Sequence, residues 1–436
     1  MVSGGPRFRV TPGASLRGEL RVPGDKSISH RALMFGGMAE GITEIEGFLD
    51  GEDCLATLKA LQALGVRIER PGAQRVRVYG AGGHFNAPVA PLDMGNAGTA
   101  MRLFMGLLCG QSFKTVLVGD PSLSRRPMER VARPLRLMGA RIDTTEGLPP
   151  VTLHGGVPLH GIDYRLPVAS AQLKSALLLA GLHAEGTTRI TEPAITRDHT
   201  ERMLRAFGVN VRQEGLTVSV NGGQRLRAVP VAVPGDFSSA AFFLVAGCLA
   251  ADDGLLLRNV GMNPTRTGLI QMLQAMGGQI EIRSGDPDAA EPVADLFVRR
   301  SQLRGIRVPE ELVSLAIDEF PVFFIAAAAA EGTTTVTGAA ELRVKESDRL
   351  AVMAEGLASL GVRHELHADG IVIHGGPISG GRIDSHGDHR IAMAFAVCSL
   401  AAGGTIEIDD VANVATSFPG FATLAQSIGL PVESLP

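Results

Sequence analysis

Apolar stretches with helical spacing recur along the chain, and each runs into a glycine that a short strand-like segment follows. A glycine just past a helix is the usual left-handed cap, and alternating Ile, Val and Thr after it are typical of a strand. Successive glycines of this series are 68 to 78 residues apart. The series consists of Gly41, Gly110, Gly186, Gly254, Gly332 and Gly404. The pattern therefore predicts six copies of a helix that leads into a strand.

A second series of helix end, glycine and strand alternates with the first. Its glycines are 68 to 84 residues apart, and they are Gly65, Gly139, Gly208, Gly277, Gly361 and Gly429. Glycine-capped helices before strands are common in α/β proteins, which would explain one copy but not twelve copies in register. Each repeat is therefore predicted to contain helix, strand, helix and strand, with further strands between the repeats.

A longer internal match divides the repeats into two halves. The segment VPGDKSISHRA, residues 22–32, is matched by VPGDFSSAAFF, residues 233–243. A chain of 436 residues with 45% hydrophobic content can form two domains with sizeable cores. We therefore predict one three-repeat domain over residues 22–233 and a second one formed by residues 1–21 together with 234–436.

Composition and charge exclude several classes of protein. Charged residues make up 20% of the chain and the net charge is −4, which argues against a basic nucleic-acid surface. The cysteines are widely spaced without a CxxC pair, as expected in a reducing compartment and not in a zinc or iron–sulfur site. The N-terminus lacks the apolar core of a signal peptide, and the longest apolar run, residues 322–330, is half of the about 18 residues that a membrane span needs. We expect a cytoplasmic protein that does not bind membranes.

Polar residues cluster at the predicted starts of the six apolar helices. Helix N-termini carry unpaired N–H groups and a partial positive charge, so several of them around one site would bind an anion without a basic protein. Ordinary capping is the alternative, and it accounts well for Ser238 and Thr99. The segments are KSISHR at 26–31, GNAGTAMR at 95–102, SAQLK at 170–174, GDFSS at 235–239, IDEFP at 317–321 and GDHR at 387–390.

Capping does not explain the cations in these segments. Only five of the 41 basic residues are lysines, so a lysine such as Lys26 or Lys345 suggests a need for a compact, titratable ammonium. The alternative for either residue is a solvated surface lysine. Candidate guanidinium groups for carboxylate or phosphate are Arg102, Arg126, Arg197 and Arg390, with surface salt bridges as the alternative.

The motifs of several other chemistries are absent from the sequence. The chain has no GxGxxG after a strand, no Walker motif, no HExxH and no GxSxG. The segment HGDHR at 386–390 lacks a second His or Asp cluster, so we expect a helix cap with an arginine there and no metal. Asp318 and Glu346 are the carboxylates best placed for acid–base work, because each lies at a helix start among cations. The residues themselves predict a phosphate-rich ligand and carboxylates, without a metal or other cofactor.

Eight segments in this order resemble the 5-enolpyruvylshikimate-3-phosphate synthase family over essentially the whole chain. They are PGDKSISHR, GNAGTAMR, LSRRPMERV, ASAQLKSALLLAG, TRDHTERM, IDEFP, LRVKESDRL and GDHRIAMAF. The resemblance implies an α/β fold of two similar domains, each with three βαββαβ repeats around a pseudo-threefold axis. In this enolpyruvyl transferase fold, the helix N-termini face the cleft between the domains.

The resemblance also implies the substrates and the residues that bind them. Shikimate 3-phosphate is expected to contact Lys26, Ser27, Arg31, Ser170, Ala171, Gln172, Arg197, Asp318 and Lys345. Phosphoenolpyruvate is expected to contact Lys26, Asn96, Gly98, Arg126, Gln172, Arg349 and Arg390, with Thr99 and Arg102 shaping the pocket. Residues 22–233 would then supply most of the shikimate 3-phosphate site, and the other domain acid–base and phosphoenolpyruvate ligands.

The implied reaction is an addition followed by an elimination. The 5-hydroxyl group of shikimate 3-phosphate adds to C2 of phosphoenolpyruvate while C3 is protonated, and the tetrahedral intermediate then loses inorganic phosphate. Asp318 fits the base on the hydroxyl group, and Lys26 and Glu346 are the candidates for proton delivery. Glyphosate competes with phosphoenolpyruvate in this family, and Gly98 predicts sensitivity to it because a methyl group there would obstruct the inhibitor.

Two positions depart from the usual family pattern. Thr416 stands in ATSFPG where many members have a lysine, and Arg197 stands where many have an aromatic residue. These features suggest a divergent bacterial branch of the family. Two other functions stay open: a UDP-N-acetylglucosamine enolpyruvyl transferase, whose reactive cysteine is absent before Arg126, and a non-catalytic repeat protein of the same fold. We expect a monomer.

Overall fold

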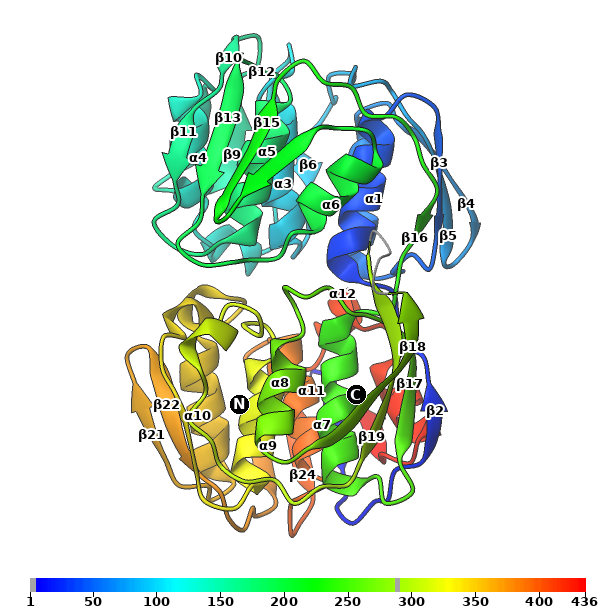
Figure 1. Ribbon diagram of the computed structural model, residues 1–436, viewed down its shortest axis with the longest axis vertical. Helices are drawn as coiled ribbons and strands as arrows, with labels where there is room; N and C mark the ends of the chain where they lie inside the picture. Colours follow the sequence, from blue (N-terminus) through cyan, green and yellow to red (C-terminus); the bar gives the residue numbers. More distant parts are fainter. Residues whose placement is uncertain (1–4, 287–290) are drawn as a thin grey trace. The chain divides into compact units, whose positions relative to one another are not determined.

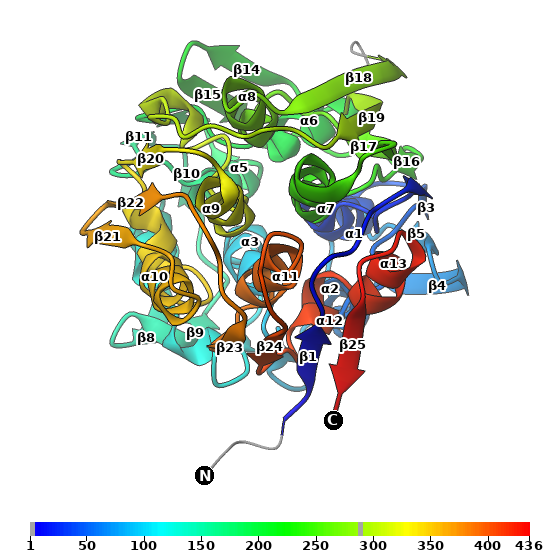
Figure 2. The ribbon, with the colours of Figure 1, turned by 90° about the horizontal axis from the view of Figure 1, so that it is seen from below.

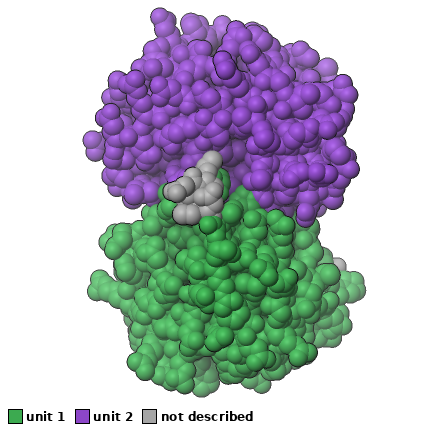
Figure 3. Space-filling model, turned by 45° about the vertical axis from the view of Figure 1, so that its right-hand side comes forward, with its two compact units in different colours: residues 1–23, 234–436 green, residues 24–233 purple. Residues whose placement is uncertain are grey.

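The structure is a computed structural model that describes residues 5–286 and 291–436. The chain forms two compact units, of which unit 1 comprises Met1–Pro23 and Pro234–Pro436 and unit 2 comprises Gly24–Val233 (Figure 3). Our sequence boundary placed residue 22 in the domain that corresponds to unit 2. Val22 is instead buried in the hydrophobic core of unit 1, so this residue and Pro23 belong with the C-terminal half.

The helices and strands follow the predicted repeat. In each repeat a long helix leads into a strand and a second helix follows (Figure 1). A β-hairpin ends the first five repeats, whereas the sixth ends with β25 (Val432–Leu435), which pairs with β1 (Arg7–Val10) from the N-terminus. Gly41 has a φ of +108° between the first helix and its strand, and Gly65 has a φ of +88° after the second helix. L-residues with a Cβ rarely adopt these angles, which is why glycine occupies both positions. The predicted α/β class and the six repeats are confirmed.

Unit 2 contains three repeats. Its helices are α1 (Lys26–Met38), α2 (Glu52–Ala63), α3 (Gly98–Leu108), α4 (Glu129–Leu137), α5 (Ala171–Gly181) and α6 (His199–Ala206). Its main strands are β3 (Ile42–Glu46), β4 (Arg67–Gly72), β5 (Arg75–Tyr79), β6 (Leu92–Asp93), β7 (Thr115–Val118), β8 (Ile142–Thr145), β9 (Leu148–Leu153), β11 (Asp163–Arg165), β13 (Thr187–Thr191), β14 (Val211–Glu214), β15 (Thr217–Asn221) and β16 (Val231–Ala232). A small additional sheet pairs β10 (Leu159–His160) with β12 (Ala184–Glu185).

Unit 1 contains the other three repeats. Its helices are α7 (Phe237–Ala250), α8 (Gly268–Ala275), α9 (Phe320–Ala329), α10 (Arg349–Ser359), α11 (His389–Cys398), α12 (Val414–Ser417) and α13 (Phe421–Ser427). Its strands are β1 (Arg7–Val10), β2 (Gly18–Leu20), β17 (Leu255–Gly261), β18 (Gln279–Asp286), β19 (Val293–Arg299), β20 (Thr333–Val336), β21 (His364–His367), β22 (Gly370–His374), β23 (Gly381–Asp384), β24 (Ile406–Asp409) and β25 (Val432–Leu435).

The sheets share one topology. Each four-stranded sheet of unit 2 has an outer strand that runs parallel to the strand after the long helix, and the hairpin strands then add antiparallel, as in β16-β3-β5-β4. The orders β2-β17-β19-β18 and β23-β24-β1-β25 in unit 1 follow the same rule. The sheet β20-β22-β21 has only isolated bridges at Arg304 and Arg307 in place of the outer strand. One topology therefore recurs six times with one weakened copy.

The long helices form the centre of each unit. In unit 1, α7, α9 and α11 lie side by side with the sheets outside them (Figure 2). α9 has a buried residue at almost every position, so it is apolar all round, as expected of a helix enclosed by other elements. Within the described ranges, no helix is both long and apolar enough to cross a membrane. The polar side chains of α1, α5 and α11 lie in the first two turns of each helix.

Candidate active site

Four of the six long helices begin with a side-chain cap. Asp25, Asp236 and Asp388 accept hydrogen bonds from the backbone N–H groups of Ile28, Ser238 and Arg390 at 2.7 to 2.9 Å. Ser170 caps α5 by accepting from the backbone of Leu173 at 3.4 Å. No side-chain cap is present at the starts of α3 and α9, where Gly98 and Phe320 are the first helical residues. The N–H groups at these two starts are thus not used by a capping side chain.

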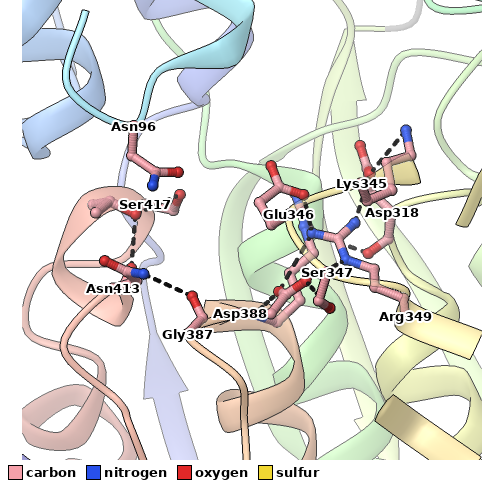
Figure 4. A network of polar contacts seen from close by, with 12 residues as sticks. Asn96, Asp318, Lys345, Glu346, Ser347, Arg349, Gly387, Asp388, Asn413 and Ser417 are labelled. Carbon is pink, nitrogen blue, oxygen red and sulfur yellow. Dashed lines mark hydrogen bonds and ion pairs between the residues drawn. The ribbon is translucent and has the colours of Figure 1, made fainter. Parts of the chain in front are cut away.

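In unit 1, the buried guanidinium group of Arg349 forms ion pairs with three carboxylates (Figure 4). Its Nε lies 2.9 Å from Oδ2 of Asp388, its Nη2 2.6 Å from Oε2 of Glu346, and its Nη1 3.1 Å from Oδ1 of Asp318. Ser347 donates a further hydrogen bond to Asp388 at 3.0 Å. The first residue of α10 therefore fixes the two carboxylates that the sequence predicted for acid–base work.

The charges in this cluster support one another. Burial disfavours a charged Arg349, but Asp388, Glu346 and Asp318 outweigh it and raise the pKa of this guanidinium group. Burial likewise opposes a charged Asp388, and Arg349 holds the pKa of that carboxyl group below its usual range. Asp388 and Arg349 therefore form a buried ion pair that stays charged at neutral pH.

Two further predicted cations belong to the same cluster. The ammonium group of Lys345 lies 3.7 Å from Oδ1 of Asp318, and Nη1 of Arg390 donates to the backbone oxygen of Asp318 at 3.1 Å. Asp318 is only partly buried, with 14% of its side chain exposed, so a ligand can still reach it. The structure brings together all five unit 1 residues that the sequence singled out, while their roles stay predictions.

In unit 2, the first helix presents two of the predicted cations. The ammonium group of Lys26 lies 3.0 Å from Oδ2 of Asp53 at the start of α2. Arg31 is buried, and its Nη1 donates to the backbone oxygen of Ser27 at 2.9 Å. Asp53 therefore orients the ammonium group of Lys26, and the backbone oxygen of Ser27 orients the guanidinium group of Arg31.

A second group of predicted residues meets around the start of α3. Arg102 donates to Oε1 of Gln172 at 2.8 Å, and Nε2 of Gln172 donates to the hydroxyl oxygen of Thr99 at 2.9 Å. Arg126 donates to Oδ1 of Asn96 at 2.5 Å. A Cβ added at Gly98 would lie 3.0 and 3.1 Å from the Nη1 atoms of Arg126 and Arg102, so both guanidinium groups converge on this glycine.

The remaining predicted residues are placed as follows. Ala171 is the first residue of α5, directly after its cap Ser170. Arg197 lies in the loop between β13 and α6. Thr416 donates to the backbone oxygen of Asn413 at 2.7 Å within its own short helix. Capping was the wrong explanation for Ser238 and Thr99, because Ser238 bonds to Glu319 and Arg266, and Thr99 accepts from Gln172.

Several residues that contact the site were not predicted from the sequence. Asp53 pairs with Lys26, Asp120 accepts from Asn96 at 2.8 Å, and Asp388 pairs with Arg349. The sequence contained a signal for Asp388, because the segment GDHR was identified as a helix cap with an arginine. It contained no signal that Asp388 pairs with Arg349, which lies 39 residues earlier. Within the described part of the chain, no group of three or more His, Cys, Asp or Glu residues is arranged to hold a metal ion. The arrangement offers cations for anionic ligands and carboxylates for proton transfer.

Comparisons with known proteins find similarity over nearly the whole chain. Residues 10–424 match the family described as EPSP synthase (3-phosphoshikimate 1-carboxyvinyltransferase). A 3-phosphoshikimate 1-carboxyvinyltransferase from Alkalilimnicola ehrlichii is 60% identical over 426 residues, which are 97% of this chain and 96% of the relative. The protein of the same name from Methylococcus capsulatus is 57% identical over 428 residues, 98% of each chain. A solved EPSP synthase from Acinetobacter baumannii has a TM-score of 0.89 and 52% identity, and covers 99% of this chain and 100% of its own.

Proposed function

The chain belongs to the EPSP synthase family, and from this premise we propose that it is a 3-phosphoshikimate 1-carboxyvinyltransferase. It transfers the enolpyruvyl group of phosphoenolpyruvate to the 5-hydroxyl group of shikimate 3-phosphate and releases inorganic phosphate. The observation that carries this proposal is the Arg349 cluster, which holds Asp318 and Glu346 beside Lys345. It provides proton-transfer groups next to cations, which this reaction requires.

We assign most of the shikimate 3-phosphate ligands to unit 2. The buried guanidinium group of Arg31 and the start of α5 suit a phosphate and hydroxyl groups, because both present fixed N–H donors. The proposed ligands are Lys26, Ser27, Arg31, Ser170, Ala171, Gln172 and Arg197, together with Asp318 and Lys345 from unit 1.

We assign phosphoenolpyruvate to the cations around Gly98 and to the Arg349 cluster. A start of α3 without a side-chain cap, flanked by Arg126, favours the binding of a carboxylate or phosphate. Gly98 has no Cβ, which leaves room for the ligand between the two guanidinium groups. The proposed ligands are Lys26, Asn96, Gly98, Arg126, Gln172, Arg349 and Arg390.

In the proposed reaction, the oxygen of the 5-hydroxyl group bonds to C2 of phosphoenolpyruvate, and Asp318 takes the proton of this hydroxyl group. A proton is delivered to C3, by Lys26 or Glu346, to give the tetrahedral intermediate. Loss of a proton from C3 restores the carbon–carbon double bond as the C2–O bond to phosphate breaks. The cations next to the phosphate stabilise the negative charge on the leaving group.

The structure disfavours the cysteine-dependent sister enzyme. All four cysteines lie in the described residues and are buried. Burial raises the pKa of Cys109, Cys248 and Cys398 to about 12, so none of these three provides a thiolate at neutral pH. We also infer a cytoplasmic location, because free cysteines are typical of a reducing compartment.

A phosphate-release assay with two acceptors tests the proposal. The protein is incubated with phosphoenolpyruvate and either shikimate 3-phosphate or UDP-N-acetylglucosamine. We expect phosphate release only with shikimate 3-phosphate. Release with the sugar nucleotide would assign the chain to the sister activity, and no release with either acceptor would indicate a non-catalytic protein.

A further inference from the structure

Lys174 is a charged residue in the core of unit 2 to which the proposed reaction gives no role. Only 1% of its side chain is exposed. Its ammonium group lies 2.7 Å from Oε2 of Glu192 and 2.7 Å from Oε1 of Glu201, and both glutamates are buried as well. Burying an ammonium group together with two carboxyl groups costs desolvation free energy, so stability alone is a weak reason for this cluster. The cluster therefore points to a function in positioning.

The ammonium group connects three segments. Lys174 is on α5, Glu192 follows directly after β13, and Glu201 is on α6. The ammonium group also donates to the backbone oxygen of Thr196 at 3.5 Å, and the hydroxyl group of Thr196 donates to Glu192. Thr196 directly precedes Arg197. The loop that carries Arg197 is thus attached at two points to the start of α5.

The chain neighbours of Lys174 and Glu201 hold Arg31. The hydroxyl groups of Ser175 and Thr200 lie 2.7 Å apart and are both buried. Nε of Arg31 donates to Thr200 at 2.7 Å, and its Nη2 donates to Ser175 at 3.0 Å. Because the ion pair between Lys174 and Glu201 fixes α5 against α6, it also fixes the distance between these two hydroxyl groups.

The cluster does not hold the residues around Gly98, where we propose that phosphoenolpyruvate binds, in the same way. Gln172, which is proposed to contact both substrates, connects α5 to these residues. Gln172 is two residues before Lys174 on α5, which places the two side chains about 200° apart around the helix. Gln172 bonds to Arg102 and Thr99 on α3. Lys174 extends from the opposite side of α5 and bonds to Glu192. A disturbance at Lys174 should therefore affect one substrate more than the other.

The charge of Lys174 is stable in this setting. Burial works against the charged form, but Glu201 and Glu192 outweigh it and raise the pKa of Lys174. Burial also raises the pKa of Glu201, with Lys174 opposing that effect. Arg31 is the cation on the neighbouring helix α1, so two cations and two carboxylates lie together in this part of the core.

We propose that Lys174 is a positioning residue that sets the affinity for shikimate 3-phosphate by holding Arg31 and Arg197 in place. This inference rests on the proposed function of the chain. Lys174 contacts no substrate itself. It acts by holding the start of α5, the loop before α6 and α6 in one arrangement, in which two guanidinium groups are oriented towards one ligand.

The test separates this role from a structural one. Lys174→Met removes the charge at similar volume, and we expect the KM for shikimate 3-phosphate to rise about tenfold or more, because small misplacements of binding groups are costly. The KM for phosphoenolpyruvate should change less than about threefold on the same reasoning. Calorimetric titration with shikimate 3-phosphate alone should show the same loss of affinity. Lys114→Met, at an exposed lysine of unit 2, is the matched control and should change neither constant.

A second variant decides the question if Lys174→Met does not fold. Thr196→Val keeps the shape and removes the hydroxyl donor to Glu192, and the KM for shikimate 3-phosphate should rise about threefold, the effect of one lost hydrogen bond. Unchanged or equally raised KM values for the two substrates in a folded variant would overturn the inference. If the unaltered protein releases no phosphate but binds shikimate 3-phosphate, the proposed function has failed. Equal calorimetric affinity in the unaltered and variant proteins would then overturn the role of Lys174 separately.

Discussion

The ammonium group of Lys26 is both fixed and accessible. It lies 3.0 Å from Oδ2 of Asp53, with 17% of the lysine side chain exposed. Replacing Lys26 by Met removes the charge, and we expect kcat to fall by about 10²-fold or more, since a positioned proton donor contributes about 10²–10⁴-fold. Phosphate release at saturating substrate measures this.

Lys59→Met is the control for this prediction. Lys59 is an exposed residue of α2, the helix that also carries Asp53. Its replacement should leave kcat unchanged. Similar losses in both variants would mean that Lys26 is not part of the active site.

Gly98 is expected to control access for the competitive inhibitor glyphosate. A methyl group there would lie 3.0 Å from Nη1 of Arg126 and 3.1 Å from Nη1 of Arg102, so it would reduce the space between these groups. In Gly98→Ala, the inhibition constant for glyphosate should rise more than the KM for phosphoenolpyruvate. The difference should be about 1–3 kcal/mol, the usual effect of one methyl group in a pocket. Steady-state kinetics measure both constants.

Gly376→Ala is the matched control, because an added Cβ there meets nothing within 4 Å. It should change neither constant. Equal rises of the two constants in Gly98→Ala would show that Gly98 is needed only for its backbone, and the steric explanation would be wrong.

His30 makes the stability of unit 2 depend on pH. Burial, and then Lys26 and Arg31, lower its pKa from 6.5 to about 3. Between these two values the unfolded chain binds a proton that the folded chain does not bind. The free energy of unfolding should therefore decrease as the pH falls below about 6.5, by up to about 1.4 kcal/mol per pH unit. Urea unfolding between pH 5 and pH 7.5 measures this slope.

His30→Gln removes this contribution from the slope. His183, whose pKa is also lowered by burial, contributes with the same sign and remains in the variant. The slope should therefore decrease but not vanish. Identical slopes in the two proteins would show that His30 is not held in its neutral form.

Among the strands, β1 has the most distant partners in the sequence. It lies between β24 and β25, so Phe8 faces Ile408 on one side and Ser434 on the other. Phe8 is 6% exposed, and its ring centroid lies 6.1 Å from that of Phe421. Phe8→Ala should destabilise unit 1 by about 3–5 kcal/mol, the usual cost of removing a buried aromatic side chain. Urea unfolding of the whole chain should show the shift in one transition.

Ile42→Ala is a control in a strand of unit 2. Ile42 is 51% exposed, and its replacement should cost about 0.5 kcal/mol or less. If Phe8→Ala shifted the unfolding of both units equally, the N-terminal strand would not be specific to unit 1.

At the scale of the whole chain, unit 2 is formed by one continuous segment of the sequence and unit 1 by two separate segments. Unit 2 is the single segment 24–233, and its core cluster lies entirely within that segment. Residues 24–233 expressed alone should therefore fold and unfold cooperatively in urea, because a domain with its own complete hydrophobic core can fold by itself. Circular dichroism at increasing urea concentration measures the transition.

Residues 234–436 expressed alone provide the comparison. Without the N-terminal segment, the sheet of β17 lacks β2, and β24 and β25 lack the strand between them. This fragment should unfold at a lower urea concentration and less cooperatively than the same residues in the full chain. An equally cooperative transition would show that β1 and β2 are dispensable.

The sequence by itself determined the repeats and the candidate residues. Helix ends, glycine caps and alternating strands are local patterns, because they depend on the angles and spacing of neighbouring residues. The family motifs predicted Asp318, Lys345, Glu346, Arg349 and Arg390 as residues of one site, and the structure brings these residues together.

Only the tertiary structure decided which charges pair. Asp388 lies 39 residues after its partner Arg349, and Arg9 bonds to Glu407 across 398 residues. The lysine composition drew attention to Lys26 and Lys345 but gave no reason to link Lys174 to Glu192 and Glu201. A buried charge is stable only beside a partner that the fold brings within about 4 Å, and such a contact between distant segments leaves no periodic signal in the sequence.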